Sequence, residues 1–118
     1  MTRLFRGAIA ALLLISVSGC MSLITGGELL RPGEPTGVIV VENASNVPID
    51  VVLISDCSVG SYGLNRLPQG TEIAPGRSYT FTVSAGCWDV DAGTTYGGME
   101  ARQRMQVRAG SGVRYTVS

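Results

Sequence analysis

The chain is 118 residues long and carries nine basic residues against nine Asp and Glu, so its net charge at pH 7 is zero. This length allows one domain, and the balanced charge gives no electrostatic case for binding nucleic acid. The sequence contains no histidine, which removes the commonest general base and excludes Ser-His-Asp and Cys-His catalytic sets. It also lacks the glycine motifs that cradle nucleotide phosphates, so we expect a protein that is not an enzyme and has no cofactor.

The first twenty residues form a targeting pattern. Two arginines precede an apolar run over 7–17, which ends in the motif Val17-Ser18-Gly19-Cys20. This order resembles the signal of bacterial lipoproteins, whose lipobox ends in a cysteine. The resemblance implies cleavage before Cys20 and attachment of lipid to its sulfur. An ordinary secretory signal is the alternative. A retained membrane span is excluded because it needs about 20 apolar residues, whereas the run over 7–17 has 11.

The same resemblance implies a location and a division of the chain. The residue after the cysteine biases lipoprotein sorting, and here it is Met21 rather than the aspartate typical of inner-membrane retention. We therefore expect a lipid anchor in the outer membrane, with the protein facing the periplasm. The expected divisions are a signal peptide over 1–19, a lipidated cysteine and flexible tether over 20–36, and a β-domain over 37–118.

The tether is predicted from its composition. The sixteen residues from Met21 to Thr36 include three glycines and two prolines and show no sustained periodicity. A flexible coil of this length averages roughly 20 to 24 Å between its ends. The apolar pairs Leu23-Ile24 and Leu29-Leu30 leave an alternative open, in which part of the segment lies on the membrane or packs on the domain.

Two cysteines remain after lipidation, Cys57 and Cys87. An even pair in an oxidising compartment predicts a disulfide in a small domain. Closing a loop of about 30 residues is worth roughly 3 to 4 kcal/mol in the chain-entropy account. A reactive redox pair would favour a Cys-x-x-Cys motif at the start of a helix, and the two cysteines here lie far apart in a β-rich sequence.

Alternating or β-branched runs, separated by turn residues, predict strands along the rest of the chain. A turn at 43–46 is expected to join the first two strands into a hairpin, and a short edge strand over 71–73 would make a seventh. The six other expected strands cover 37–42, 49–55, 78–84, 87–92, 99–109 and 113–117. In the strand over 99–109, alternation groups Ala101, Gln103, Met105 and Val107 on one face.

This arrangement predicts an all-β fold, a small two-sheet antiparallel sandwich of about seven strands; a small β-barrel is the alternative. The runs 43–54 and 73–90, the second built on Pro75-Gly76-Arg77-Ser78 and Gly86-Cys87-Trp88-Asp89-Val90, resemble two hairpins of small bacterial β-sandwich domains. The resemblance implies an immunoglobulin-like or transthyretin-like sandwich. Such domains mostly bind, present or pack, so it implies no catalytic residue.

Arginines give the first candidate site. Alternation places Arg102, Arg104 and Arg108 on one face of a strand, with Arg114 on the next strand. Such a stripe suits carboxylate or phosphate groups, for example those of lipid A or peptidoglycan. The alternative interpretation is that exposed arginines keep the strand soluble and discourage edge pairing.

Two further candidates are a loop and a set of acidic residues. The glycine-rich stretch 58–67 carries Tyr62, Asn65 and Arg66 and is interpreted either as a binding loop or as a plain crossover between sheets. Asp89 and Asp91, with Asp56 near the expected disulfide, offer oxygen ligands for calcium. The alternative is that these carboxylates form the solvent face of a strand, and no metal is assigned.

The leading hypothesis is a non-enzymatic, membrane-anchored lipoprotein that acts as a binding module in the cell envelope. Its partner would be another envelope protein or an envelope polysaccharide. A second hypothesis is an inhibitor, because Ser111-Gly112-Val113-Arg114-Tyr115 resembles a segment of small lipoprotein inhibitors of lysozyme. Those inhibitors insert a serine and a lysine into the lysozyme cleft, and this chain has no lysine.

Overall fold

The computed structural model describes residues 26–95, 98 and 100–118, and within these ranges the regular structure consists of strands. The expected all-β class is therefore confirmed. The six strands are β1 (Thr36–Asn43), β2 (Val51–Asp56), β3 (Ser78–Ser84), β4 (Gly86–Gly93), β5 (Glu100–Val107) and β6 (Gly112–Val117). None of the described residues belongs to a helix that could cross a membrane. The predicted signal peptide and Cys20 lie outside the described residues.

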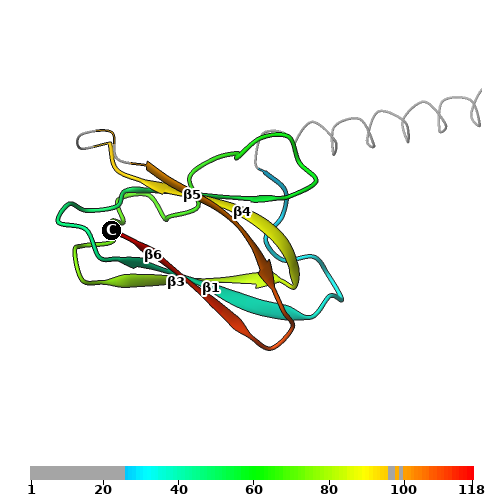
Figure 1. Cartoon of the computed structure of the whole chain (residues 1–118). Helices are drawn as coiled ribbons and strands as arrows, with labels where there is room; N and C mark the ends of the chain where they lie inside the picture. Colours follow the sequence, from blue (N-terminus) through cyan, green and yellow to red (C-terminus); the bar gives the residue numbers. More distant parts are fainter. Residues whose placement is uncertain (1–25, 96–97, 99) are drawn as a thin grey trace, which may run out of the picture.

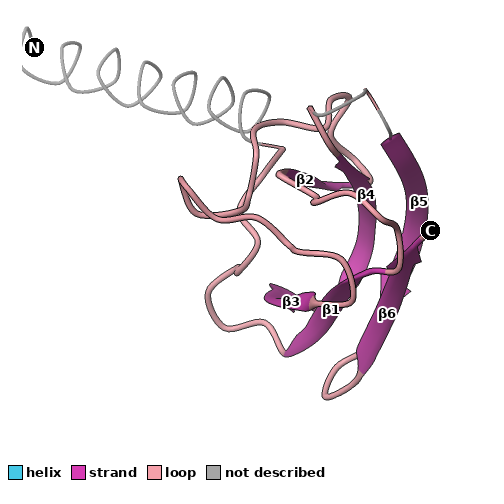
Figure 2. Cartoon of the chain, turned by 90° about the vertical axis from the view of Figure 1, so that its left-hand side faces the viewer, coloured by secondary structure: helices cyan, strands magenta, loops and turns pink. Residues whose placement is uncertain are grey.

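The strands form two three-stranded sheets, ordered β3-β1-β6 and β2-β4-β5. Figures 1 and 2 show the two sheets as separate layers, so the fold is a sandwich and not a closed barrel. All pairs are antiparallel except β1 and β6, which run parallel. The parallel pair joins the first and last strands of the sandwich in one sheet.

The hairpin predicted between the first two strands is wrong. β1 pairs with β3 and β6, whereas β2 pairs with β4 in the other sheet. The buried Asn43 redirects the chain, because its side-chain amide donates to the carbonyls of Val47 at 2.7 Å and Ile73 at 2.8 Å. β1 and β2 both bury alternate side chains, as the sequence predicted. This alternation does not distinguish two strands paired in one sheet from two strands that face each other across the core.

The hairpin implied between β3 and β4 is also absent. A single residue, Ala85, separates the two strands, and the chain changes sheet there. Among the six strands, only β4 and β5 are consecutive and paired. The segment expected to form a seventh strand, 71–73, contributes one isolated bridge, between Ile73 and Ile49.

The core lies between the sheets and follows the expected alternation in most strands. Trp88, Val90 and Ala92 of β4 are fully buried, as are Ile39 and Val41 of β1. β5 differs from the expectation. Its buried large side chains are confined to its second half, and Gln103, which alternation placed on the inner face, is exposed. In the first half of β5, only Ala101 packs against the core, and it is partly buried.

The predicted disulfide is confirmed. Cys57 follows β2 and Cys87 lies at the start of β4, and their Cα atoms are 5.5 Å apart across the bond. The bond ties the beginning of the 57–65 loop to the neighbouring strand of the same sheet. It therefore fixes one end of that loop against the sheet.

The flexible tether expected over 20–36 is not what the structure shows from Gly26 onward. The carbonyl of Gly26 accepts a hydrogen bond from the amide of Asp56 at 3.0 Å, and that of Leu29 accepts one from Ser84 at 2.7 Å. The carbonyl of Pro35 accepts a third from Ala85 at 2.8 Å. We call residues 26–35 the docked segment; they follow the alternative in which this stretch packs on the domain.

Candidate functional site

Two of the predicted candidates meet on the outer face of the β2-β4-β5 sheet. The loop 57–65 leaves β2 and reaches across the sheet toward β5. The guanidinium carbon of Arg102 lies 5.2 Å from the centre of the Tyr62 ring, within the range of a cation–π contact. The tyrosine of the predicted loop and an arginine of the predicted stripe therefore form one surface.

The arginines on this face are paired with carboxylates. In the register of β4 and β5, Asp89 lies opposite Arg104 and Asp91 opposite Arg102. Arg104 donates to both carboxylate oxygens of Asp89, from Nε at 2.8 Å and from an Nη at 3.1 Å. Arg102 reaches Asp91 at 3.3 Å and also pairs with Glu100. We call these five residues the charge ladder.

The predicted cationic stripe is consequently not a patch of positive charge. The charge ladder holds three carboxylates and two guanidinium groups, so its formal charge is negative. Arg108 lies beyond the end of β5 and is exposed, and it makes no ion pair with the residues that the structure describes. Arg114 does not belong to this face, because it lies on β6 in the other sheet and pairs with Glu42.

Asp91 is the least accessible member of the ladder. Its side chain is 8% exposed, against 59% for Arg102. Burial raises the pKa of the Asp91 carboxyl above its ordinary value, and the neighbouring Glu100 raises it further, while Arg102 acts in the opposite direction. The interpretation of Asp91 as part of a freely solvated face is therefore wrong, because neighbouring side chains shield its carboxylate.

Two hollows lie on this outer face. The larger of the two, of about 300 Å³, is an open hollow between the 57–65 loop and the sheet, and we call it the loop hollow. It is lined by Ser55, Cys57, Val59, Gly60, Ser61, Tyr62, Asp89 and Arg104. The smaller hollow, of about 210 Å³, lies beside Asp91 and Glu100. The lining of the loop hollow combines an aromatic ring, hydroxyl groups and a paired carboxylate and guanidinium.

Asn65, a predicted member of the binding loop, is a structural residue. The side-chain oxygen of Asn65 accepts from the amide of Val52 at 2.9 Å, and its amide group donates to the carbonyl of Asp50 at 2.9 Å. These bonds hold the end of the loop along the edge of β2. The side chain thereby replaces a backbone partner on an edge strand.

Arg66, the other predicted member, faces away from the loop hollow and toward the docked segment. An Nη of Arg66 donates to the carbonyl of Gly27 at 2.6 Å and to that of Ile54 at 2.9 Å. Burial lowers the pKa of the Arg66 guanidinium. Of the three predicted loop residues, only Tyr62 lines the loop hollow.

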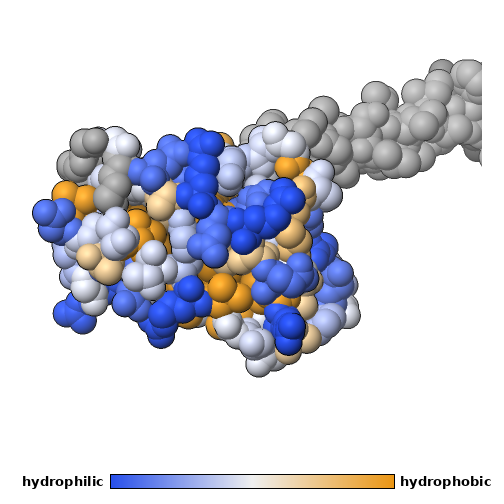
Figure 3. All heavy atoms as spheres, viewed as in Figure 1, coloured by the Kyte–Doolittle hydropathy of each residue, from blue (hydrophilic) through white to orange (hydrophobic). Residues whose placement is uncertain are grey.

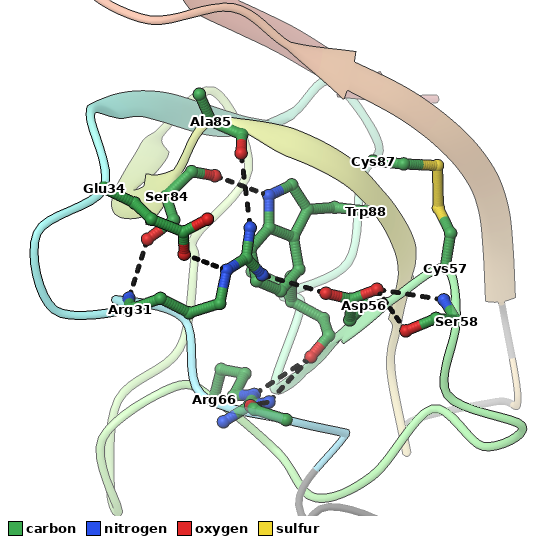
Figure 4. Close-up of polar contacts among 12 residues, drawn as sticks. Arg31, Glu34, Asp56, Cys57, Ser58, Arg66, Ser84, Ala85, Cys87 and Trp88 are labelled. Carbon is green, nitrogen blue, oxygen red and sulfur yellow. Dashed lines mark hydrogen bonds and ion pairs between the residues drawn. A yellow bond between two sulfur atoms is a disulfide. The ribbon is translucent and has the colours of Figure 1, made fainter.

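A second polar cluster, which the sequence analysis missed, surrounds Arg31 of the docked segment (Figure 4). Its guanidinium carbon lies 5.2 Å from the centre of the Trp88 ring. The same group pairs with Asp56 at 2.8 Å and with Glu34, and it donates to the carbonyl of Ala85 at 3.3 Å. No periodicity in the sequence marks these contacts, because all of them except the local Glu34 pair join residues 25 to 57 positions apart.

Ser84 and Asp56 complete this cluster. Ser84 follows the inward-facing Val83 and would face solvent by alternation, but the docked segment covers it and it is fully buried. Its hydroxyl oxygen accepts from the amide of Arg31 at 2.7 Å, and its carbonyl accepts from the Trp88 ring nitrogen at 2.8 Å. Hydrogen bonds from Ser58, together with the Arg31 charge, lower the pKa of the Asp56 carboxyl against the effect of burial.

The acidic residues considered as calcium ligands are dispersed. Asp56 faces Arg31, Asp89 faces Arg104, and Asp91 faces Arg102. Within the described part of the chain, no three acidic or thiol side chains gather into a group that could hold a metal. Each of these carboxylates already has a guanidinium partner, which a cation would have to displace.

The surface seen in Figure 3 is predominantly hydrophilic, with small hydrophobic areas between the polar ones. Comparison with known proteins gives no family, since no protein-family model and no curated protein matches the chain. The chemistry of the site therefore carries the functional argument. The site combines an aromatic ring with hydroxyl groups and a paired carboxylate and guanidinium.

Proposed function

We propose that this protein is a lipoprotein of the bacterial cell envelope, anchored through lipid on Cys20 and acting as a non-enzymatic binding module. The anchor places it at the outer membrane, on the periplasmic side. The lipobox resemblance supports this assignment, and the disulfide adds to it. Because Cys57 and Cys87 are bonded to each other, Cys20 is the one thiol of the chain's three cysteines left for acylation.

The binding site that the geometry favours is the loop hollow. Its volume, about 300 Å³, lies at the lower end of the range for ligand pockets, which suits one small unit of a larger ligand. Tyr62 presents an aromatic ring at its rim, and Tyr is enriched among residues that dominate binding energies. The observation that carries the proposal is the contact of Tyr62 with Arg102 above the Asp89–Arg104 pair.

The paired charges favour an uncharged polar ligand. An anion would compete with Asp89 for Arg104, and a cation would compete with Arg104 for Asp89. Binding of either ion would therefore require separation of a bidentate ion pair, which is unfavourable. Neutral hydroxyl groups can donate to the free lone pairs of a carboxylate and accept from the remaining guanidinium N–H groups. A neutral polysaccharide therefore fits this lining better than phosphate-bearing or carboxylate-bearing envelope components.

A titration followed by NMR tests the site. The probes are a neutral oligosaccharide, tri-N-acetylchitotriose, and inorganic phosphate. We expect the sugar to shift the amide signals of Ser61, Tyr62 and Asp89, and Tyr62→Ala to weaken this binding about tenfold or more, as loss of an aromatic contact residue commonly does. Arg114→Gln on the opposite sheet is the control and should leave binding unchanged. Binding of phosphate without the sugar would contradict the assignment of a neutral ligand.

The anchor is tested in cells by labelling with a fatty-acid probe. Label should appear on the protein and disappear in Cys20→Ala. Ser18→Ala is the matched control, because it keeps a small residue in the lipobox and should retain the label. Label that persists in Cys20→Ala would refute the anchor without bearing on the loop hollow.

Inhibition of a lysozyme-like hydrolase is a second candidate function, supported by the position of Ser111. Ser111 is exposed in the turn between β5 and β6, which is where a serine inserted into an enzyme cleft would have to lie. Arg114 is paired with Glu42, and Tyr115 is buried. A lysozyme inhibition assay with the wild type and with Ser111→Ala separates this function from binding at the loop hollow.

A further inference from the structure

The docked segment changes how far the domain can stand from its anchor. Five residues, 21–25, separate Cys20 from Gly26, the first residue of the docked segment. Six Cα-to-Cα steps span at most about 20 Å, whereas the sixteen steps of a free tether from 20 to 36 would span up to about 55 Å. We propose that the sandwich lies directly against the lipid surface, with the end that carries the docked segment toward the bilayer. This inference rests on the proposed lipidation.

Gly26 is held close to the sheet by contacts that require glycine. Its φ is +82°, a conformation that L side chains rarely adopt. A Cβ at this position would lie 2.9 Å from Cβ of Ser55 and 3.1 Å from the carbonyl oxygen of Tyr62. The next residue, Gly27, accepts the hydrogen bond from Arg66. The chain is therefore fixed to the domain from its first described residue.

The strand directions define which end is anchored. β1 and β6 begin at this end, and β2, β3 and β5 end there, so the docked segment, Ala85 and the 108–111 turn lie together. The 44–50 loop, the Pro75-Gly76 turn and Ser118 lie at the opposite end. Strands of six to eight residues separate the two ends by about 20 to 25 Å. An end within 20 Å of the anchor therefore faces the lipid, while the other end points into the periplasm.

Within the described residues, the anchored end has no net positive charge that would attract an anionic membrane. Its three carboxylates, Glu28, Glu34 and Asp56, are matched in number by Arg31, Arg66 and Arg108, so its described residues carry no excess of positive charge. Polybasic clusters supply the electrostatic attraction in proteins that bind lipid headgroups unaided. The domain is consequently held at the surface by its short connection, and the chain without lipid should not bind vesicles.

The experiment uses the chain from Cys20, which contains every strand and every core residue. With the disulfide intact, Cys20 is the single free thiol, and a maleimide lipid in nanodiscs captures it without cellular acylation. Gadolinium-chelating lipids then attenuate NMR signals near the surface. We expect amide signals of Ser58 and Ser111 to lose at least twice as much intensity as those of Ser45 and Gly76. The same chain with Cys20 left free should show no attenuation.

A matched variant carries sixteen Gly and Ser residues inserted between Cys20 and Gly26. This insertion adds an average of roughly 20 to 24 Å and should abolish the difference between the two ends. Equal attenuation of both ends in the original chain, or an unchanged pattern after the insertion, would overturn the inference. Failure of fatty-acid labelling in cells would instead refute the lipoprotein assignment, so the two outcomes are distinguishable.

Discussion

The guanidinium of Arg31 lies over the ring of Trp88, with 5.2 Å between the guanidinium carbon and the ring centre. Trp88 is fully buried, so Arg31 closes one end of the core while its charge is balanced by Asp56 and Glu34. This single contact connects the segment that leads to the predicted anchor with the largest side chain of the core. Figure 4 shows the two residues together with their polar partners.

Replacing Arg31 with alanine should release the docked segment and leave the sandwich folded. The amides of Ser84 and Asp56 donate to carbonyls of this segment, so their hydrogen exchange should accelerate about tenfold or more as local opening becomes easier. Amides of β1 paired with β3 should remain protected. Hydrogen exchange followed by NMR measures both sets.

The control for this substitution is Arg77→Ala, which removes an exposed arginine at the opposite end of the sandwich. It should leave the exchange of Ser84 and Asp56 unchanged. If Arg31→Ala also left these amides protected, the backbone bonds alone would hold the segment. The Trp88 contact would then have no part in docking.

Removal of the disulfide should cost a large share of the stability. Cys57 and Cys87 close a loop of 30 residues, for which the chain-entropy account gives about 3.5 kcal/mol. The Cys57→Ser, Cys87→Ser double variant should therefore show a lower denaturation midpoint in urea. Wild type with a reducing agent is the parallel measurement, and equal midpoints in the oxidised and reduced chain would contradict the expectation.

The sequence predicted the strands better than their partners. Alternation in 78–84 and 113–117 located β3 and β6 to within one residue, because burial on one face imposes a period of two. The same signal does not reveal which strand lies beside which. The pairing of β1 with β3 and β6 is accompanied by the bond from Asn43 to the Ile73 carbonyl, 30 residues away, and by a change of sheet at Ala85. The alternation within a single strand does not contain either feature.

The sequence predicted individual residues of the candidate site but not the contacts between them. Tyr62 and Arg102 were both selected for their residue types, and the fold brings them into contact. The neutralisation of Arg104 by Asp89 depends on the register of β4 against β5, which the separate strand patterns do not contain. Arg31 was missed because a run rich in glycine and proline also suits a flexible linker, and only tertiary contacts distinguish the two.

Breaking the charge ladder at Arg102 should have a different result from removing Arg108. Arg102→Gln leaves the buried Asp91 beside Glu100 without its cation, so the pKa of Asp91 should rise further. The thermal midpoint should fall at pH 7 and recover toward that of wild type as the pH falls and Asp91 is protonated. Arg108→Gln, at an exposed position without an ion pair among the described residues, should match wild type throughout. Identical melting curves for the two variants would show that the ladder does not stabilise this face.

Asp56 and Asp91 should respond to pH in opposite directions. The folded state lowers the pKa of Asp56, chiefly through the hydrogen bond from the Ser58 amide, so ionised Asp56 stabilises the fold above its unfolded pKa of about 3.9. This contribution is lost as the pH falls through the lowered folded value. Asp56→Asn should therefore reduce the free energy of unfolding by about 1 kcal/mol at pH 7, the value typical of such hydrogen bonds. The difference should shrink as the pH falls through the lowered pKa of folded Asp56.

The folded state raises the pKa of Asp91, first through burial and then through Glu100. Ionisation of Asp91 therefore costs stability as the pH rises above the unfolded value of about 3.9. Asp91→Asn should leave the free energy of unfolding equal to or above that of wild type at pH 7, because Arg102 is exposed and still has Glu100 as a partner. Urea unfolding of both Asn variants between pH 2 and pH 7 measures the two effects. A loss of stability at pH 7 in Asp91→Asn as large as in Asp56→Asn would show that the Arg102 pair outweighs the cost of burying the Asp91 carboxylate.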